Sequence, residues 1–167
     1  FFFFSSILLP ASLFADFGGW SADSQFFDLI GSTPLLAHGL GVAVADAKTL
    51  FTAPEEGEYT LYVRTRNWTA YWSEAKTPGI FEVFVDGQSA GLFGNEKSEW
   101  HWQRGAKIAL AQGEHTVVVR DITGFDGRFD ALLFTRSDEA PEEGLEAYRS
   151  LRKSLLGLPQ SIVRAGS

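Results

Sequence analysis

Apolar and polar residues alternate along the middle of the chain with a period of two, which is the pattern of half-buried β-strands. The clearest example is residues 57–66, where Tyr59, Leu61 and Val63 share one face. Asp86-Gly87 follows a second apolar run and is a strong β-hairpin signal. The predicted strands are residues 42–44, 50–52, 57–66, 80–85, 90–93, 99–103, 107–110, 115–120 and 129–135. Short strands in this number, separated by turn residues, predict an all-β antiparallel sandwich or barrel.

Residues 137–158 have a different period and predict one amphipathic linker helix of about four turns. Ser137 or Asp138 is the predicted N-cap, with Pro141 in the first turn. The apolar stripe consists of Leu145, Tyr148, Leu151 and Leu155. This stripe must pack either on the sandwich or on a domain that follows, and residues 159–167 form a tail.

The first 15 residues are apolar and uncharged, and they admit two interpretations. They are fewer than the about 20 residues that a membrane-spanning helix needs. They suit the remnant of a secretory signal peptide, with Ala15 as the small residue at the cleavage site. Alternatively, residues 7–17 form a first, buried strand. The signal interpretation implies a secreted or periplasmic protein whose β-sandwich spans residues 16–136.

Composition and charge narrow the classes of function. The net charge of −7 argues against a nucleic-acid-binding protein, which needs a basic face. The absence of Cys excludes a disulfide scaffold, a thiol nucleophile and an iron–sulfur site. The sequence contains no nucleophile elbow, no phosphate-binding glycine loop and no pair of His at zinc spacing. We therefore predict neither an enzyme nor a bound organic cofactor for this chain alone.

Large aromatic residues follow the strand at 57–66, beside cationic and amide side chains. Exposed flat rings stack on the apolar C–H face of a pyranose, while guanidinium and amide groups bond its hydroxyls. The predicted stacking residues are Trp68, Tyr71 and Trp72. The predicted hydrogen-bonding residues are Arg64, Arg66 and Asn67. Further candidates for contact with the sugar are His101 and Arg128. The alternative is that these rings close one end of the sandwich.

An acidic turn at residues 121–130 is the candidate metal site. Asp121, Asp126 and Asp130 could hold a calcium ion through carboxylate oxygens, although the spacing is not that of a helix–loop–helix calcium site. The favoured alternative is a set of Asx-type turns with an ion pair between Arg128 and a carboxylate. A carboxylate pair for glycoside cleavage is a further hypothesis, which the crowding of the three residues in one turn disfavours.

Several motifs occur in order along residues 16–136. They are Gly18-Gly19-Trp20, Leu35–Gly41, Val63–Trp68, Trp100-His101-Trp102 and Asp121–Ala131. Together they resemble the β-sandwich module of bacterial secreted FAD-dependent oxidoreductases, which is similar to the carbohydrate-binding-like domain of xanthan lyases and golvesin. The resemblance implies a galactose-binding-like jelly roll outside the cytoplasm, followed by an enzyme domain. FAD would belong to that following domain, because the flavin-binding positions do not occur in this chain.

Two functions are consistent with these observations. The first is a non-catalytic glycan-binding module that recognises a polysaccharide or oligosaccharide as part of a larger secreted protein. The alternative is a structural domain that packs against a flavoenzyme domain and binds no sugar. The alternative predicts that the helix exposes its apolar stripe in the isolated chain.

Overall fold

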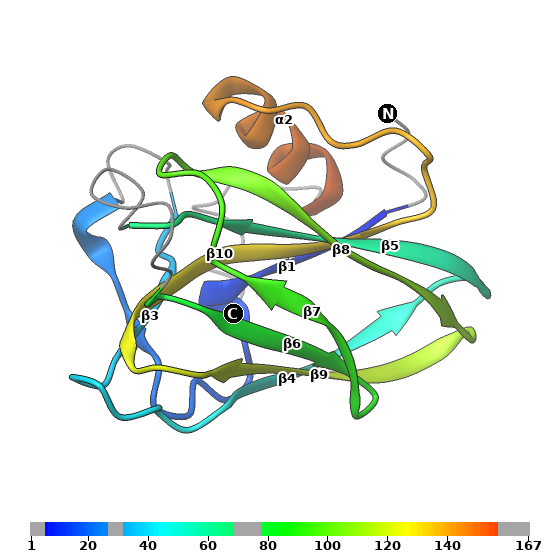
Figure 1. The fold of residues 1–167 in the computed structure, drawn as a ribbon. Helices are drawn as coiled ribbons and strands as arrows, with labels where there is room; N and C mark the ends of the chain where they lie inside the picture. Colours follow the sequence, from blue (N-terminus) through cyan, green and yellow to red (C-terminus); the bar gives the residue numbers. More distant parts are fainter. Residues whose placement is uncertain (1–5, 27–31, 69–77, 157–167) are drawn as a thin grey trace.

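Two antiparallel β-sheets face each other in the computed structural model, which describes residues 6–26, 32–68 and 78–156 (Figure 1). The larger sheet contains β1 (Ser6–Pro10), β2 (Ser21–Ala22), β3 (Leu35–His38), β5 (Gly57–Thr65), β8 (His101–Leu110) and β10 (Phe125–Thr135). The smaller sheet has the order β4 (Ala47–Ala53), β9 (Gly113–Asp121), β6 (Phe81–Val85) and β7 (Gln88–Phe93). Short 3₁₀ turns lie at Ala11–Leu13 and Ser24–Phe26. The predicted all-β sandwich is confirmed.

Strand β10 is the centre of the larger sheet. It pairs with β5 along one edge, and with β3 and then β1 along the other. Residues 6–10, for which the sequence left two interpretations open, form β1 here. The register with β5 shifts between Phe129 and Ala131, so Asp130 is an extra residue in a β-bulge.

The main core lies between the two sheets and is rich in aromatic rings. Trp20 packs edge-on against Phe81 and Phe129, with ring centroids 5.7 and 5.2 Å apart. Phe51 stacks on Phe134 at 4.6 Å. Such pairs add about 0.5–1.5 kcal/mol each beyond the area they bury. This packing fixes the two sheets, and therefore the ends of the strands from which the loops emerge.

The helix α2 (Leu145–Leu156) covers the outer face of the larger sheet (Figure 1). Tyr148 and Leu151 of its stripe are buried in a second cluster with Leu8, Tyr62, Trp102, Ala131 and Leu133. The Tyr148 hydroxyl donates to Asp130, and Arg152 donates to the Tyr148 oxygen at 2.9 Å. The exposed stripe that a docking domain would present is therefore not observed. No helix among the described residues is long and apolar enough to cross a membrane.

The helix starts later than predicted. Residues 137–144 are not helical, and the first helical hydrogen bond runs from Tyr148 N–H to Gly144 O. The reason is a tertiary contact, because the Glu143 carboxylate accepts the backbone N–H of Trp102 at 2.9 Å on the edge strand β8. The predicted caps Ser137 and Asp138, and the placement of Pro141 in a first turn, are wrong.

Three strand predictions also differ from the structure. Residues 42–44 form a loop, and β3 was not predicted. Residues 101–103 and 107–110 of the two predicted strands belong to the single strand β8, which runs through Gly105, whereas residues 99 and 100 precede it. A Cβ at Gly105 would lie 2.7 Å from the Phe93 ring, so this glycine permits close approach and does not mark a turn.

His115 connects the turn after β6 to the turn before β9. Its Nδ1 lies 2.6 Å from Asp86 Oδ2, and its Nε2 lies 2.7 Å from Ala111 O. Both partners are acceptors, so the ring donates both hydrogen bonds only when it is protonated. Burial lowers the pKa of His115, but the bonds to Ala111 and Asp86 outweigh burial and raise the net pKa above its ordinary value.

We expect His115 to make stability depend on pH. A pKa raised in the folded state stabilises the fold fully below the unfolded pKa of about 6.5, and this contribution is lost as pH rises through the folded-state pKa. His115→Gln should therefore lower the melting temperature more at about pH 5.5 than at about pH 9. Thermal unfolding of both proteins at the two pH values measures the difference, and an equal loss at both would contradict the expectation.

Candidate functional site

Five large apolar or aromatic residues lie on the loops where β3, β5 and β9 end and β10 begins. They are Leu40 and Val42 in the β3–β4 loop, Ile122 and Phe125 around the β9–β10 turn, and Trp68 after β5. The exposed fractions are 79% for Leu40, 72% for Val42, 44% for Ile122 and 48% for Phe125, and Trp68 is half-buried. We call these five residues the loop rim. Large apolar residues exposed on neighbouring loops are candidates for a binding surface.

Glycines bring the two main loops of the rim together. The N–H groups of Gly39 and Gly41 donate to Gly124 O at 2.9 and 3.4 Å. Gly124 has a φ of +72°, and a Cβ there would lie 2.2 Å from the Val42 carbonyl oxygen. A Cβ at Gly41 would lie 3.2 Å from the Phe125 ring. The β3–β4 loop therefore lies directly against the turn that carries Phe125.

The buried carboxylate of Asp121 joins the same two loops. Its Oδ2 accepts the N–H of Val44 at 2.9 Å, and its Oδ1 accepts the N–H of Gly124 at 3.1 Å. The residue is 2% exposed. Hydrogen bonds to a charged acceptor are stronger than neutral ones. Asp121 therefore positions the rim loops.

Trp68 connects a third segment to the rim. Its indole N–H donates to Phe125 O at 2.8 Å, and its ring lies 3.1 Å from the Cβ position of Gly79. The ring therefore lies at the end of the sandwich, half-buried, with its N–H already bonded. The predicted stacking residues Tyr71 and Trp72 lie outside the described residues.

The other predicted ligand residues are less accessible than the rim, since two are buried and two are half-buried. Asn67 is buried, and its backbone N–H donates to Lys97 O at 2.7 Å, while Arg66 is half-buried. His101 is buried, with Nδ1 3.0 Å from Glu99 O. Arg128 is half-buried and donates to Asp23 Oδ2 at 3.1 Å and to Asp126 O at 3.2 Å. The carboxylate that pairs with Arg128 thus comes from a distant loop.

Arg64 lies beneath α2 and not at the rim, which corrects its predicted role. Its guanidinium lies 4.7 Å from the ring centroid of Tyr148 and 5.4 Å from that of Trp102. Its NH1 lies 3.4 Å from Glu143 Oε1. Burial lowers the pKa of Arg64, although the neighbouring Tyr148, Glu143 and Asp130 oppose this. The alternation along β5 places Arg64 on the face that the helix covers.

The three acidic residues of the predicted calcium site face different partners. Asp130 accepts from the Ser32 hydroxyl and from Tyr148 on the helix side, whereas Asp121 holds the rim loops. Asp126 lies 2.6 Å from Nδ1 of His38. Within the part of the chain that the structure describes, no three His, Cys, Asp or Glu side chains are placed to hold a metal ion. The predicted Asp121, Asp126 and Asp130 cluster is therefore not assembled, either as a metal site or as a catalytic pair.

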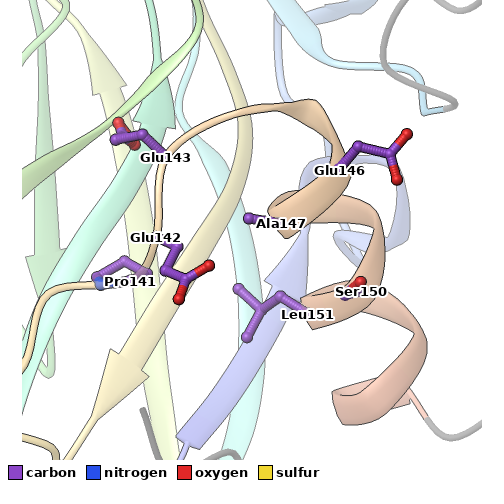
Figure 2. A pocket seen from close by; sticks show the side chains of 7 residues that line it. All are labelled: Pro141, Glu142, Glu143, Glu146, Ala147, Ser150 and Leu151. Carbon is purple, nitrogen blue, oxygen red and sulfur yellow. The ribbon is translucent and has the colours of Figure 1, made fainter.

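A pocket of about 500 Å³ lies beside α2, away from the rim (Figure 2). Its lining consists of Pro141, Glu142, Glu143, Glu146, Ala147, Ser150 and Leu151. Glu143 is already bonded to Trp102 and Arg64, so it holds the segment before the helix. The lining is acidic and has no aromatic ring, so it offers nothing on which a pyranose could stack. The loop rim is the better candidate for sugar binding.

Sequence reasoning did not identify Leu40, Val42, Ile122 and Phe125. Val42 belongs to the predicted strand at residues 42–44, and the segments of Leu40, Ile122 and Phe125 are rich in glycine and have no apolar period. One usable signal is the placement of large apolar residues next to glycines, as in Gly39-Leu40-Gly41. The structure adds an observation that the sequence does not contain, since Leu40 has a φ of +54°. This conformation is uncommon for a branched side chain and is often found at functional sites.

The fold is that of carbohydrate-binding modules of known structure. Comparison of the sequence with family models and with curated proteins finds no match. A family 35 carbohydrate-binding module from Clostridium thermocellum has 20% identity and a TM-score of 0.58, covering 78% of this chain and 97% of that one. A family 35 module from an environmental isolate has 18% identity and a TM-score of 0.53, covering 82% and 98%. These likenesses confirm the predicted jelly-roll sandwich.

A multidomain enzyme contains the same fold. The GH26-CBM35 β-(1,4)-mannanase of Podospora anserina has 16% identity and a TM-score of 0.60. The match covers 82% of this chain but 29% of the mannanase. The chain thus spans the length of isolated modules and less than a third of that enzyme.

The role of Asp121 is testable without a ligand. Asn has one acceptor oxygen, so in Asp121→Asn at most one of the Val44 and Gly124 N–H groups keeps its bond. We expect faster hydrogen exchange at one or both amides and a loss of about 1–3 kcal/mol in the free energy of unfolding. Asp16→Asn, which alters a bond to Gly18 N–H on the surface, is the control and should cost less. Unchanged exchange at both amides would refute the role.

Proposed function

We propose that this chain is a non-catalytic glycan-binding module and that the loop rim contacts the sugar. The observation that carries the proposal is the group of exposed apolar side chains on loops joined by Asp121 and Gly124. The likeness of the fold to isolated carbohydrate-binding modules supports it. Loops at one end of a rigid sandwich are common places for binding residues.

Phe125 is the proposed stacking residue. The residue is about half exposed, and the far end of its ring, at Cζ, lies against Gly41. The electron-rich face of an aromatic ring suits the apolar C–H face of a pyranose. Trp68 supports this ring through its bond to Phe125 O and adds apolar surface beside it.

Polar groups next to Phe125 would bond the sugar hydroxyls. The His38–Asp126 pair lies one residue away, with His38 56% exposed. Arg66 and Arg128, both half-buried, are further donors at the same end of the sandwich. Tyr71 and Trp72 stay predictions from the sequence. A surface with one main stacking ring should bind in the micromolar to millimolar range, or about 4–8 kcal/mol.

We do not propose catalysis by this chain. The carboxylates of Asp121 and Asp130 are buried and already accept hydrogen bonds from the protein, so neither is placed to transfer a proton to a bound sugar. Docking of a partner on the helix stripe is also disfavoured, because Tyr148 and Leu151 already pack on the sandwich.

We also propose which kind of longer protein contains this module. The family 35 module within the mannanase is an example of this fold in a longer enzyme. By the resemblance of its motifs, we propose that the parent of this chain is a secreted or periplasmic FAD-dependent oxidoreductase, with FAD bound by a following domain. The motifs alone support this parentage.

Removal of the Phe125 ring tests the role of the rim. Phe125→Ala should weaken binding at least tenfold, equivalent to about 1.4 kcal/mol, with little change in melting temperature because the ring is half exposed. A glycan array first identifies a bound sugar, and isothermal titration calorimetry then measures the variants. Leu92→Ala, at a similarly exposed position on β7, is the control and should bind like the wild type. A blank array, or normal binding by Phe125→Ala, would overturn the proposal.

A further inference from the structure

We propose that residues 6–16 are kept in the mature protein, and that this N-terminal segment holds α2 on the larger sheet. The chain is then not cut after Ala15, the position that the apolar N-terminus suggests. A leader for export, where the longer protein has one, is removed before Ser6. Processing of the chain and coupling of its two ends are independent of the sugar that the loop rim contacts.

Strand β1 is paired along its whole length. Its register with β10 runs without a shift from Ser6, opposite Thr135, to Pro10, opposite Ala131. The Ser6 hydroxyl also donates to Thr135 Oγ1 at 2.9 Å. Residues 131–135 of β10 are fully buried. Without β1, the backbone groups of β10 that face it would lose their partners next to the core, where unpaired N–H and C=O groups are costly.

Both faces of β1 are covered, which explains its unbroken apolar run. Ile7 and Leu9 pack against the main core, whereas Leu8 lies in the cluster beneath α2. A short apolar run without alternation is consistent with a strand that is buried on both faces. The part of the N-terminus that suits a signal peptide is therefore explained by its place in the fold.

The residues after β1 also belong to the folded sandwich. Phe14 is 6% exposed and packs edge-on against Phe129, with ring centroids 5.3 Å apart. Asp16 exchanges both backbone hydrogen bonds with Lys48 of β4, at 3.0 and 2.8 Å. A cut after Ala15 would therefore remove an aromatic ring from the core and one strand from the larger sheet.

The same segment supports the helix near the other end of the chain. Because α2 has 12 residues, a length at which an isolated helix is marginal in water, its stability depends on packing. Leu8 is 7% exposed and is buried in one cluster with Tyr148 and Leu151 of α2. Leu155 and Leu156 pack against the same cluster. Figure 1 shows β1 beside β10 on the side that α2 covers, so loss of β1 would expose part of the apolar stripe.

Hydrogen exchange on full-length variants tests the coupling. Leu8→Ala should lower the melting temperature by about 5–15 °C and speed exchange of the α2 amides at least about tenfold, because its contact with the helix is lost. Leu110→Ala removes an equally buried leucine from the main core, so it should lower the melting temperature without this effect on α2. Leu13→Ala, at an exposed position in the N-terminal segment, should resemble the wild type in both measurements.

Equal acceleration of α2 exchange by Leu8→Ala and Leu110→Ala, or no acceleration by either, would overturn the coupling. Should Leu8→Ala fail to fold, Leu8→Val removes one methylene and is compared in its place. It should speed α2 exchange about threefold or more, and wild-type exchange in Leu8→Val would overturn the coupling in the same way.

Processing is tested on the protein recovered from the organism that makes it. Mass spectrometry should find a mature chain that contains residues 6–16, and a chain that begins at Asp16 would overturn the retention. A shortened chain produced from Asp16 onward should fail to fold or melt at least about 15 °C below the full chain. A wild-type melting temperature with protected α2 amides in the shortened chain would overturn both parts of the proposal.

Discussion

The carboxylate of Asp121 determines where the rim loops lie. Its own position is set by the smaller sheet, since it pairs with Phe81 at the end of β9. From there its two oxygens reach Val44 and Gly124, one in each loop. The loops have no ladder of their own, so this charged acceptor replaces the regular hydrogen bonds that a strand would supply. Loops ordered in advance lose little entropy when a ligand binds, which favours recognition by a small surface.

The helix explains why one face of the larger sheet is not available for binding. The bulge in β10 places both Asp130 and Ala131 toward α2, and Tyr148 closes over them. Burial raises the pKa of Tyr148 well above its usual range, with the charge of Asp130 adding to the effect, so the hydroxyl remains a donor. Arg64 is held under the same helix. In the larger sheet, the ends of the strands therefore remain accessible to a ligand.

The sequence predicts the regular parts of this structure and not the contacts between them. The period of two locates β5 and β10, and Asp86-Gly87 locates the β6–β7 hairpin, because these signals are local. Alternation also places Arg64 opposite the core, but it cannot tell that a helix covers that face. The delayed start of α2 depends on Glu143 reaching β8, which is a tertiary contact.

The candidate site is harder to predict for a related reason. Asp121, Asp126 and Asp130 are close in sequence, yet a turn and a bulge direct them to three different partners. The rim residues come from loops that are far apart in sequence and carry no period. Trp68 was identified from its chemistry, whereas Phe125 is recognised only when exposure and loop contacts are known.

An NMR titration of the ¹⁵N-labelled chain with a glycan identified by array screening would locate the bound sugar. We expect the largest chemical-shift changes at the amides of Gly41, Gly124 and Phe125 and at the indole N–H of Trp68. Changes confined to residues 142–150 around the pocket beside α2 would contradict it.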